Sequence, residues 1–143
     1  MFACGLFASA LACAWFLRGV PALDTMAAEL DVVALTKAYF EAWNSHSVEA
    51  IQSLHADKSS LHDWDATHGP TAADVAKGIA GIWKSVPAIK VEVVTIYTCG
   101  ADLSAVANIK VVVDATTTLD VCDVIEFDRH GKVVSINAFL ASA

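Results

Sequence analysis

An acidic side chain, Asp123, lies within an otherwise apolar face of a predicted strand. Side chains of an extended strand alternate between two faces, and over residues 119–127 this places Asp123 on the face expected to point to the core. The other members of that face are Leu119, Val121, Ile125 and Phe127. Burial disfavours the charged form of a carboxyl group, so an acid here must stay protonated or find polar partners. Such carboxyl groups are enriched at functional sites, and Asp123 is therefore the first candidate site residue.

Two further polar side chains are predicted to point inward from other elements. Tyr39 lies on the apolar stripe of a predicted helix, and Asp63 shares a face with Leu61 in a predicted short strand. We expect the phenol and the two carboxyl groups to meet in one cavity. A carboxylate there can act as a base that moves a proton between carbon atoms. A phenol and a protonated carboxylic acid can donate hydrogen bonds to the oxygen that becomes negative as the proton leaves.

Three helices are predicted from the spacing of apolar residues and from capping residues. Apolar side chains recur at helical intervals over residues 27–46. Ser47 is a suitable N-cap for a second helix that ends near residue 57. Thr71 begins a third helix that continues through residue 85, before Pro87.

Strands fill most of the remaining chain. One short strand is predicted over residues 59–64, and four consecutive antiparallel strands are predicted over residues 89–98, 103–115, 116–128 and 133–140. This order of elements predicts an α+β fold in which three helices pack on a curled antiparallel sheet. The concave mouth of such a sheet is a favoured place for a small-molecule pocket.

Several sequence motifs resemble those of one known superfamily. They are Tyr39-Phe-Glu-Ala-Trp-Asn44, Val48-Glu-Ala-Ile-Gln-Ser-Leu54, Leu61-His-Asp63-Trp, Gly69-Pro-Thr-Ala-Ala73, Asp123-Val-Ile-Glu-Phe127 and Gly131-Lys-Val-Val-Ser135. With these motifs the chain resembles the ketosteroid isomerase and SnoaL-like superfamily, whose fold is the nuclear-transport-factor-2-like (NTF2-like) cone. The resemblance covers residues 30–140 and implies one domain of this type over residues 23–143.

The resemblance implies a role for each candidate residue. Tyr39 falls at the position of the family's oxyanion-hole tyrosine, Asp63 at that of its proton-shuttling base, and Asp123 at that of its protonated aspartic acid. The implied activity is isomerase- or polyketide cyclase-like, with acid/base proton transfer next to the carbonyl of a small apolar substrate. The resemblance implies neither a metal nor an organic cofactor.

Several positions depart from the isomerase pattern. His62 and Trp64 flank the candidate base, where the isomerases usually have an acidic residue and a proline. His55 occupies a position that is usually a core phenylalanine in the isomerases. We expect Trp43, His62 and Trp64 to line the substrate pocket.

Two other interpretations stay open. One is a non-catalytic cone domain that serves as an assembly subunit, including a subunit of a membrane complex, and the other is a module that binds a lipophilic ligand without turnover. A cone filled by side chains, with Tyr39 and Asp123 bonded to each other, would favour the assembly role. The epoxide-hydrolase branch of the superfamily is disfavoured, because it needs an arginine between two aspartates and the arginines here are Arg18 and Arg129.

Composition limits the expected partners. The net charge is -7, with 9 Lys and Arg against 16 Asp and Glu, which argues against nucleic acid because phosphate binding needs clustered cations. The resemblance implies a homodimer through the outer face of the sheet, where Glu92, Val94 and Ile96 are expected. The four cysteines show neither a disulfide framework nor a zinc-ligand spacing.

The N-terminal residues form a separate apolar segment. Residues 1–17 contain no charge, and Val20-x-Ala22 has the small-residue spacing of a signal-peptidase site, although the usual positive n-region is missing. Residues 1–22 are therefore interpreted as a leader that is either a cleaved targeting segment or a retained anchor. A cleaved leader would make the protein secreted or organelle-targeted, and a retained one would associate it with a membrane.

Overall fold

Three helices and six strands are formed by the part of the chain that the computed structural model describes, residues 30–99 and 102–141. The helices are α1 (Val32–Asn44), α2 (Val48–Leu54) and α3 (Ala72–Ser85). The strands are β1 (His55–His62), β2 (Thr67–His68), β3 (Lys90–Thr98), β4 (Ser104–Val112), β5 (Thr118–Phe127) and β6 (Val133–Leu140). The predicted leader, residues 1–22, lies outside the described residues. None of the described helices is long and apolar enough to span a bilayer.

The six strands form one mixed sheet in the order β2-β1-β6-β5-β4-β3. From β3 to β6, each strand pairs antiparallel with the next strand along the chain, as predicted, but β1 pairs with β6 in parallel. The prediction of an antiparallel sheet is therefore corrected at this junction. Residue alternation within a strand does not reveal the direction of a distant partner, and the long crossover from β1 to β6 permits parallel pairing.

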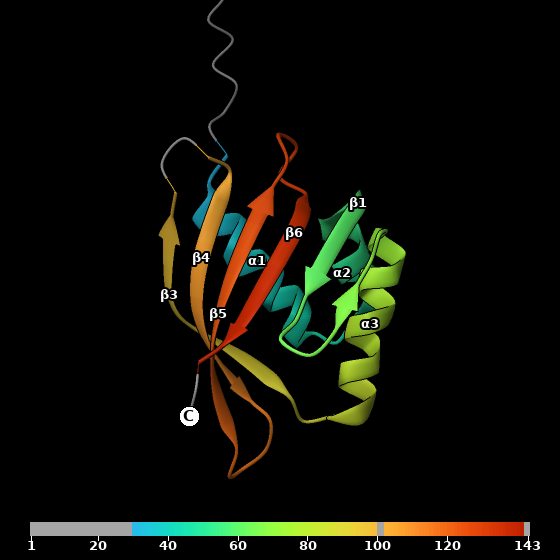
Figure 1. The fold of residues 1–143 in the computed structure, drawn as a ribbon, viewed down its shortest axis with the longest axis vertical. Helices are drawn as coiled ribbons and strands as arrows, with labels where there is room; N and C mark the ends of the chain where they lie inside the picture. The colour runs from blue at the N-terminus through green and yellow to red at the C-terminus, as the bar shows by residue number, and fades with distance from the viewer. Residues whose placement is uncertain (1–29, 100–101, 142–143) are drawn as a thin grey trace, which may run out of the picture.

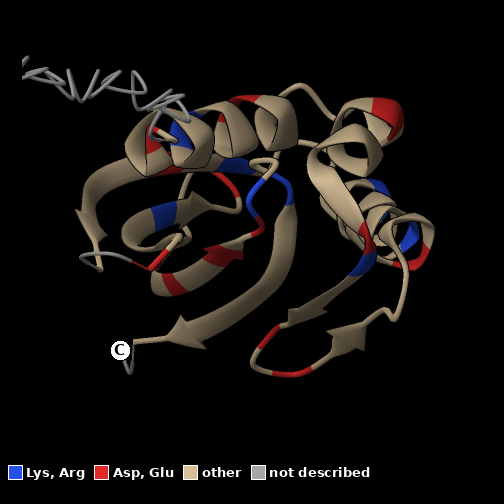
Figure 2. Cartoon of the chain, turned by 90° about the horizontal axis from the view of Figure 1, so that it is seen from above, with Lys and Arg blue, Asp and Glu red and all other residues tan. Residues whose placement is uncertain are grey.

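The helices cover one face of the sheet, which curls but does not close on itself (Figure 1). The helix α1 contacts β3 and β4, whereas α3 contacts α2, β1 and β2. Figure 2 shows the same layers from above, with the curled sheet on one side and the helices on the other. The concave face of the sheet is thus flanked by α1 and α3, which confirms the predicted α+β architecture.

The helix α1 is capped at its start and tied to the sheet at its end. The Asp31 side chain accepts a hydrogen bond from the Ala34 N–H at 2.9 Å, which explains why the helix begins at Val32. The Asn44 side chain donates to the Val91 carbonyl at 2.7 Å and accepts from the Val91 N–H at 2.8 Å. The buried side chains between these ends follow the predicted helical spacing: Val32, Thr36, Tyr39, Phe40 and Trp43.

The strand β1 begins earlier than predicted. The sequence predicted a helix to residue 57 and a strand from residue 59, whereas α2 ends at Leu54 and β1 starts at His55. The first residues of β1 are mostly polar, so their pattern did not indicate a strand; pairing with β6 provides it. Asp63 consequently lies just beyond β1, in a bend closed by a hydrogen bond from the Asp63 N–H to the Ala66 carbonyl at 2.8 Å.

The alternation of inward side chains predicted around Asp123 is confirmed in β5, and the neighbouring β4 shows the same alternation. The inward set of these strands is buried: Ala105, Ala107, Ile109, Val111, Val121, Asp123, Ile125 and Phe127. Asp123 is therefore the acidic member of an apolar inner face.

The outer face of β3 differs from the prediction at one position. Val94 is an extra residue in β3, where the register with β4 shifts. This bulge changes the alternation, so Ile96 packs against the core while Tyr97 is 56% exposed. The prediction that Ile96 lies on the outer face is wrong, whereas Glu92 and Val94 are exposed as predicted.

Candidate active site

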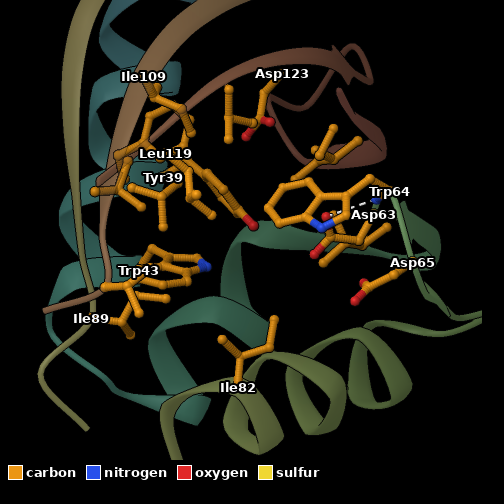
Figure 3. A pocket seen from close by; sticks show the side chains of 18 residues that line it. Tyr39, Trp43, Asp63, Trp64, Asp65, Ile82, Ile89, Ile109, Leu119 and Asp123 are labelled. Carbon is orange, nitrogen blue, oxygen red and sulfur yellow. Dashed lines mark hydrogen bonds between the residues drawn. The ribbon is translucent and has the colours of Figure 1, made fainter. Parts of the chain in front are cut away.

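A cavity of about 250 Å³ opens on the concave side of the sheet (Figure 3). Its lining includes the three polar residues singled out from the sequence, Tyr39, Asp63 and Asp123. Tyr39 comes from α1, Asp63 from the bend that follows β1, and Asp123 from β5. The fold thus gathers groups that are far apart in the chain. The remaining lining is mainly apolar, and most of it comes from β3 to β6 and from α1.

Asp123 is held between two small residues of the neighbouring strands. Its Cα partners are Ala107 of β4 and Ala138 of β6, and its carboxyl group points into the cavity in Figure 3. The residue is 7% exposed, and its Oδ1 has no hydrogen-bond partner in the described part of the chain. Burial, and then the charge of Asp63, raises the pKa of Asp123 to about 7. A substantial fraction of this carboxyl group is therefore protonated near neutral pH and able to donate a hydrogen bond.

Tyr39 supplies a second buried donor. Its ring packs edge-on against Phe40 and His55, with ring centroids 5.4 Å and 5.7 Å away. The hydroxyl points into the cavity in Figure 3, where a ligand can reach it. Burial, followed by the charges of Asp123 and Asp63, raises the pKa of the Tyr39 phenol above its ordinary value. The phenol therefore stays protonated and can donate to a ligand.

Asp63 is the half-buried acid at the mouth of the cavity. Its Oδ1 accepts a hydrogen bond from the Trp64 N–H at 2.9 Å. The pKa of Asp63 is raised, mainly by burial and also by the charge of Asp65. The hydrogen bond from Trp64 and the charge of His68 act in the opposite direction and lower it. A carboxylate whose pKa is raised is a stronger base than a solvated one and remains connected to water at the mouth.

The charges in the lining favour a neutral ligand. The lining contains three carboxyl groups, those of Asp63, Asp65 and Asp123, and no Lys, Arg or His among the described residues. An anionic ligand would therefore meet like charges without a compensating cation. Asp65 was not identified from the sequence as a lining residue because it lies in a predicted loop; the Asp63-x-Asp65 spacing was the available signal.

Two of the three predicted pocket residues line the cavity, and one does not. Trp43 lies deep in the lining and contacts Trp83, with ring centroids 5.8 Å apart, while Trp64 is 43% exposed at the mouth. The prediction that His62 lines this cavity is wrong. His62 lies on the opposite face of β1, where its Nδ1 is 3.3 Å from the Thr67 hydroxyl. Neighbouring residues of a strand face opposite sides, and Leu61 lines the cavity, so the next residue, His62, points outward.

No group of three or more His, Cys, Asp or Glu side chains in residues 30–99 and 102–141 is arranged to hold a metal ion. The three carboxyl groups of the cavity therefore do not form such a cluster. The chemistry that these residues can supply is proton transfer and hydrogen bonding.

Solved structures share this fold at low sequence identity, while no curated protein matches the chain. An NTF2-like protein of unknown function from Cytophaga hutchinsonii aligns over 79% of this chain and 92% of its own, with a TM-score of 0.64 and 9% identity. A candidate ketosteroid isomerase from Kribbella flavida aligns over 78% of each chain, with a TM-score of 0.65 and 18% identity. The epoxide hydrolase/cyclase-like enzyme SalBIII aligns over 81% of this chain and 95% of its own, with a TM-score of 0.65 and 17% identity. These structures establish the NTF2-like cone fold for this chain.

A family model extends the comparison to the sequence. The model of the SnoaL-like domain matches residues 36–136, a range that runs from α1 into β6 and includes Tyr39, Asp63 and Asp123. The match covers more than half of the chain and agrees with the family that the sequence motifs resemble. The chain belongs to the SnoaL-like domain family.

Proposed function

We propose that this protein is a cofactor-independent isomerase or cyclase that transfers a proton next to the carbonyl group of a small, neutral, largely apolar substrate. The observation that carries the proposal is the convergence of Tyr39, Asp63 and Asp123 on one mainly apolar cavity. The names of two structural neighbours, a candidate ketosteroid isomerase and a candidate polyketide cyclase from Sinorhizobium meliloti, support the same class of chemistry.

In the proposed reaction Asp63 is the general base. Its ionised carboxylate takes a proton from the carbon beside the carbonyl, which leaves an enolate and a protonated Asp63. In an isomerase the proton then returns to a different carbon. In a cyclase the enolate carbon attacks a second carbonyl, and the alkoxide that forms takes the proton back from Asp63. The raised pKa of Asp63 suits both halves of this cycle, because the group must accept a proton and then release it.

Tyr39 and protonated Asp123 are proposed to bind the carbonyl oxygen. Both residues are buried, and Oδ1 of Asp123 has no hydrogen-bond partner among the described residues. Their hydrogen bonds to the oxygen strengthen as its negative charge develops, which lowers the barrier to enolate formation. Apolar walls around them exclude water and make these bonds stronger than they would be in solution.

The volume of the cavity limits the size of the substrate. Pockets for drug-sized ligands are roughly 300–1,000 Å³, and the cavity here, at about 250 Å³, is smaller. We therefore propose compact ketones, such as those with two fused rings, as the first substrates to test.

The proposal is tested by hydrogen exchange into a bicyclic ketone. The protein is mixed with 2-decalone in D₂O, and the deuterium that enters beside the carbonyl is measured by mass spectrometry. We expect exchange above the buffer rate, and a loss of roughly 10²–10⁴-fold on Asp63→Asn, which removes the base. Asp57→Asn is the matched control, since Asp57 is an exposed acid of the preceding strand, β1, and lies outside the cavity lining.

A second candidate function, binding of a lipophilic molecule without turnover, is favoured by the apolar walls of the cavity. Saturable binding of 2-decalone together with exchange at the buffer rate would support it over the enzyme. The assembly-subunit alternative predicted a filled cone with Tyr39 bonded to Asp123; the described residues instead enclose a cavity and contain no such bond.

A further inference from the structure

A second histidine of the β1–β2 hairpin, His68, lies on the same side of the sheet as the cavity. His68 is the Cα partner of Leu61 across the antiparallel pair β1–β2. Side chains of directly opposed residues point to the same face, and Leu61 lines the cavity. The two histidines of the hairpin therefore differ: His62 faces outward, and His68 faces inward, on the side of Asp63.

The helix α3 is shaped to receive the imidazole of His68. A Cβ atom at Gly78 would overlap Cγ and Nδ1 of His68, so no larger residue fits there while the imidazole is in place. Glycine inside a helix destabilises it by about 1 kcal/mol relative to alanine, so this position needs a reason. The other glycine of α3, Gly81, has open space within 4 Å of the place that a Cβ atom would occupy. Close contact with another element is therefore particular to Gly78.

The titratable groups around Asp63 come from three parts of the fold. Asp65 and His68 belong to the same hairpin, Tyr39 comes from α1, and Asp123 comes from β5. The elements α3 and β6 contribute only apolar side chains to the lining within residues 30–99 and 102–141. His68 is thus the group whose positive charge offsets the acids around Asp63, and its charge lowers the pKa of Asp63 where that of Asp65 raises it.

We propose that His68 is a positioning residue for Asp63: the imidazole, seated against Gly78, supports the β1–β2 hairpin and stabilises the ionised carboxylate at the cavity mouth. The proposal deepens the proposed function and rests on it for its catalytic meaning.

The test follows the titration of Asp63 itself and needs no substrate. The side-chain carboxyl carbons of aspartate are followed by ¹³C NMR from pH 3 to 8 in the full-length protein, and the Asp63 signal is identified by its absence in Asp63→Asn. We expect His68→Gln to move the titration midpoint of Asp63 to higher pH. The matched control is His62→Gln, on the outer face of the same hairpin, which should leave the midpoint unchanged.

The close contact between the His68 imidazole and Gly78 is tested by a second pair of variants. Gly78→Ala forces the imidazole away from its place, so the midpoint of Asp63 should also rise. Gly81→Ala makes the same chemical change one turn later in open space and should leave the midpoint unchanged. If Gly78→Ala does not fold, as judged by thermal melting, the pair His68→Gln and His62→Gln decides alone.

An unchanged Asp63 midpoint in folded His68→Gln would overturn the proposal and leave His68 as a spacer between β2 and α3. Where the ketone assay gives turnover, His68→Gln should also move the acidic limb of kcat/KM to higher pH. Failure of the proposed function can be distinguished from failure of the role of His68. If no ketone exchanges deuterium but His68→Gln still moves the Asp63 midpoint, only the proposed function fails.

Discussion

Tyr39 neighbours two buried polar residues whose surroundings differ, Asp123 and His55. Both have a polar atom without a hydrogen-bond partner in the described structure: Oδ1 of Asp123, and both ring nitrogens of His55. Burial favours the neutral form of each, so it raises the pKa of Asp123 to about 7 and lowers that of His55 to about 4. Asp123 lines the cavity, however, while His55 is enclosed by the core. An unpartnered buried group indicates a site only where a ligand can reach it.

Asp123→Asn is expected to have the largest effect on how stability depends on pH. In the folded protein the pKa is raised from 3.8 to about 7, so the stability associated with the bound proton is fully present below pH 3.8 and lost as the pH rises through 7. This change amounts to about 4 kcal/mol in the free energy of unfolding. Asparagine does not titrate, so the free energy of unfolding of the variant should fall less between pH 4 and pH 8 than that of the wild type. Urea unfolding at the two pH values measures this difference. An equal loss in both proteins would contradict the account of Asp123.

The next effect is expected from His55→Phe, with the opposite dependence on pH. The pKa of His55 is lowered from 6.5 to about 4, so its contribution to stability is present above pH 6.5 and lost as the pH falls through 4. The loss is about 3 kcal/mol, and phenylalanine, which cannot take up a proton, avoids it. Urea unfolding at pH 4 and pH 7 measures the difference, while the ketone exchange rate should stay close to that of the wild type. A large loss of exchange would mean that His55 acts in the site.

Between these two residues, Tyr39→Phe removes only the hydroxyl that faces the cavity. Loss of one donor to a developing oxyanion typically lowers the rate by about 10²–10³-fold, or about 3 kcal/mol. Deuterium exchange into the ketone should fall by this factor, because the ring contacts with Phe40 and His55 stay in place. A rate within about twofold of the wild type would exclude the hydroxyl from the reaction.

The smallest effect concerns the outer face of the sheet, which contrasts with the cavity side. The homodimer implied by the family resemblance stays a prediction, and Val94 and Tyr97 are the exposed apolar side chains of β3 that suit it, 58% and 56% exposed. Tyr97→Lys should shift the mass measured by light scattering at micromolar concentration toward the monomer. Ala38→Lys, an exposed position of α1, is the control for added charge. A monomeric wild-type protein would contradict the expectation.

Local pattern predicted much of this molecule. The helical spacing around Tyr39 and the strand alternation around Asp123 depend on side chains that face one core, so both were readable from the sequence. The start of β1 at His55 and its parallel pairing could not be predicted from the sequence. The polar residues there form a strand because they pair with β6, which lies far along the chain. The bulge at Val94 was missed because no residue pattern marks it, and its shift of one residue reverses every side chain that follows. The outward facing of His62 follows from the same alternation that places Leu61 inward, so the sequence did contain that signal.

The cavity itself could not be predicted from periodicity. Its volume depends on how far Trp43 and Trp64 extend, and on small residues such as Ala138 beside Asp123. The place of His68 against Gly78 likewise appears only when β2 and α3 are set side by side.

The most direct test of the central claim is a crystal structure with 2-naphthol, whose oxygen and fused rings mimic a bicyclic enolate. The account predicts the rings inside the cavity and the naphthol oxygen about 2.5–3.0 Å from both the Tyr39 hydroxyl and an Asp123 carboxyl oxygen. Asp63 should then lie beside the ring carbons next to that oxygen. A naphthol oxygen that points to solvent, away from Tyr39 and Asp123, would contradict the account.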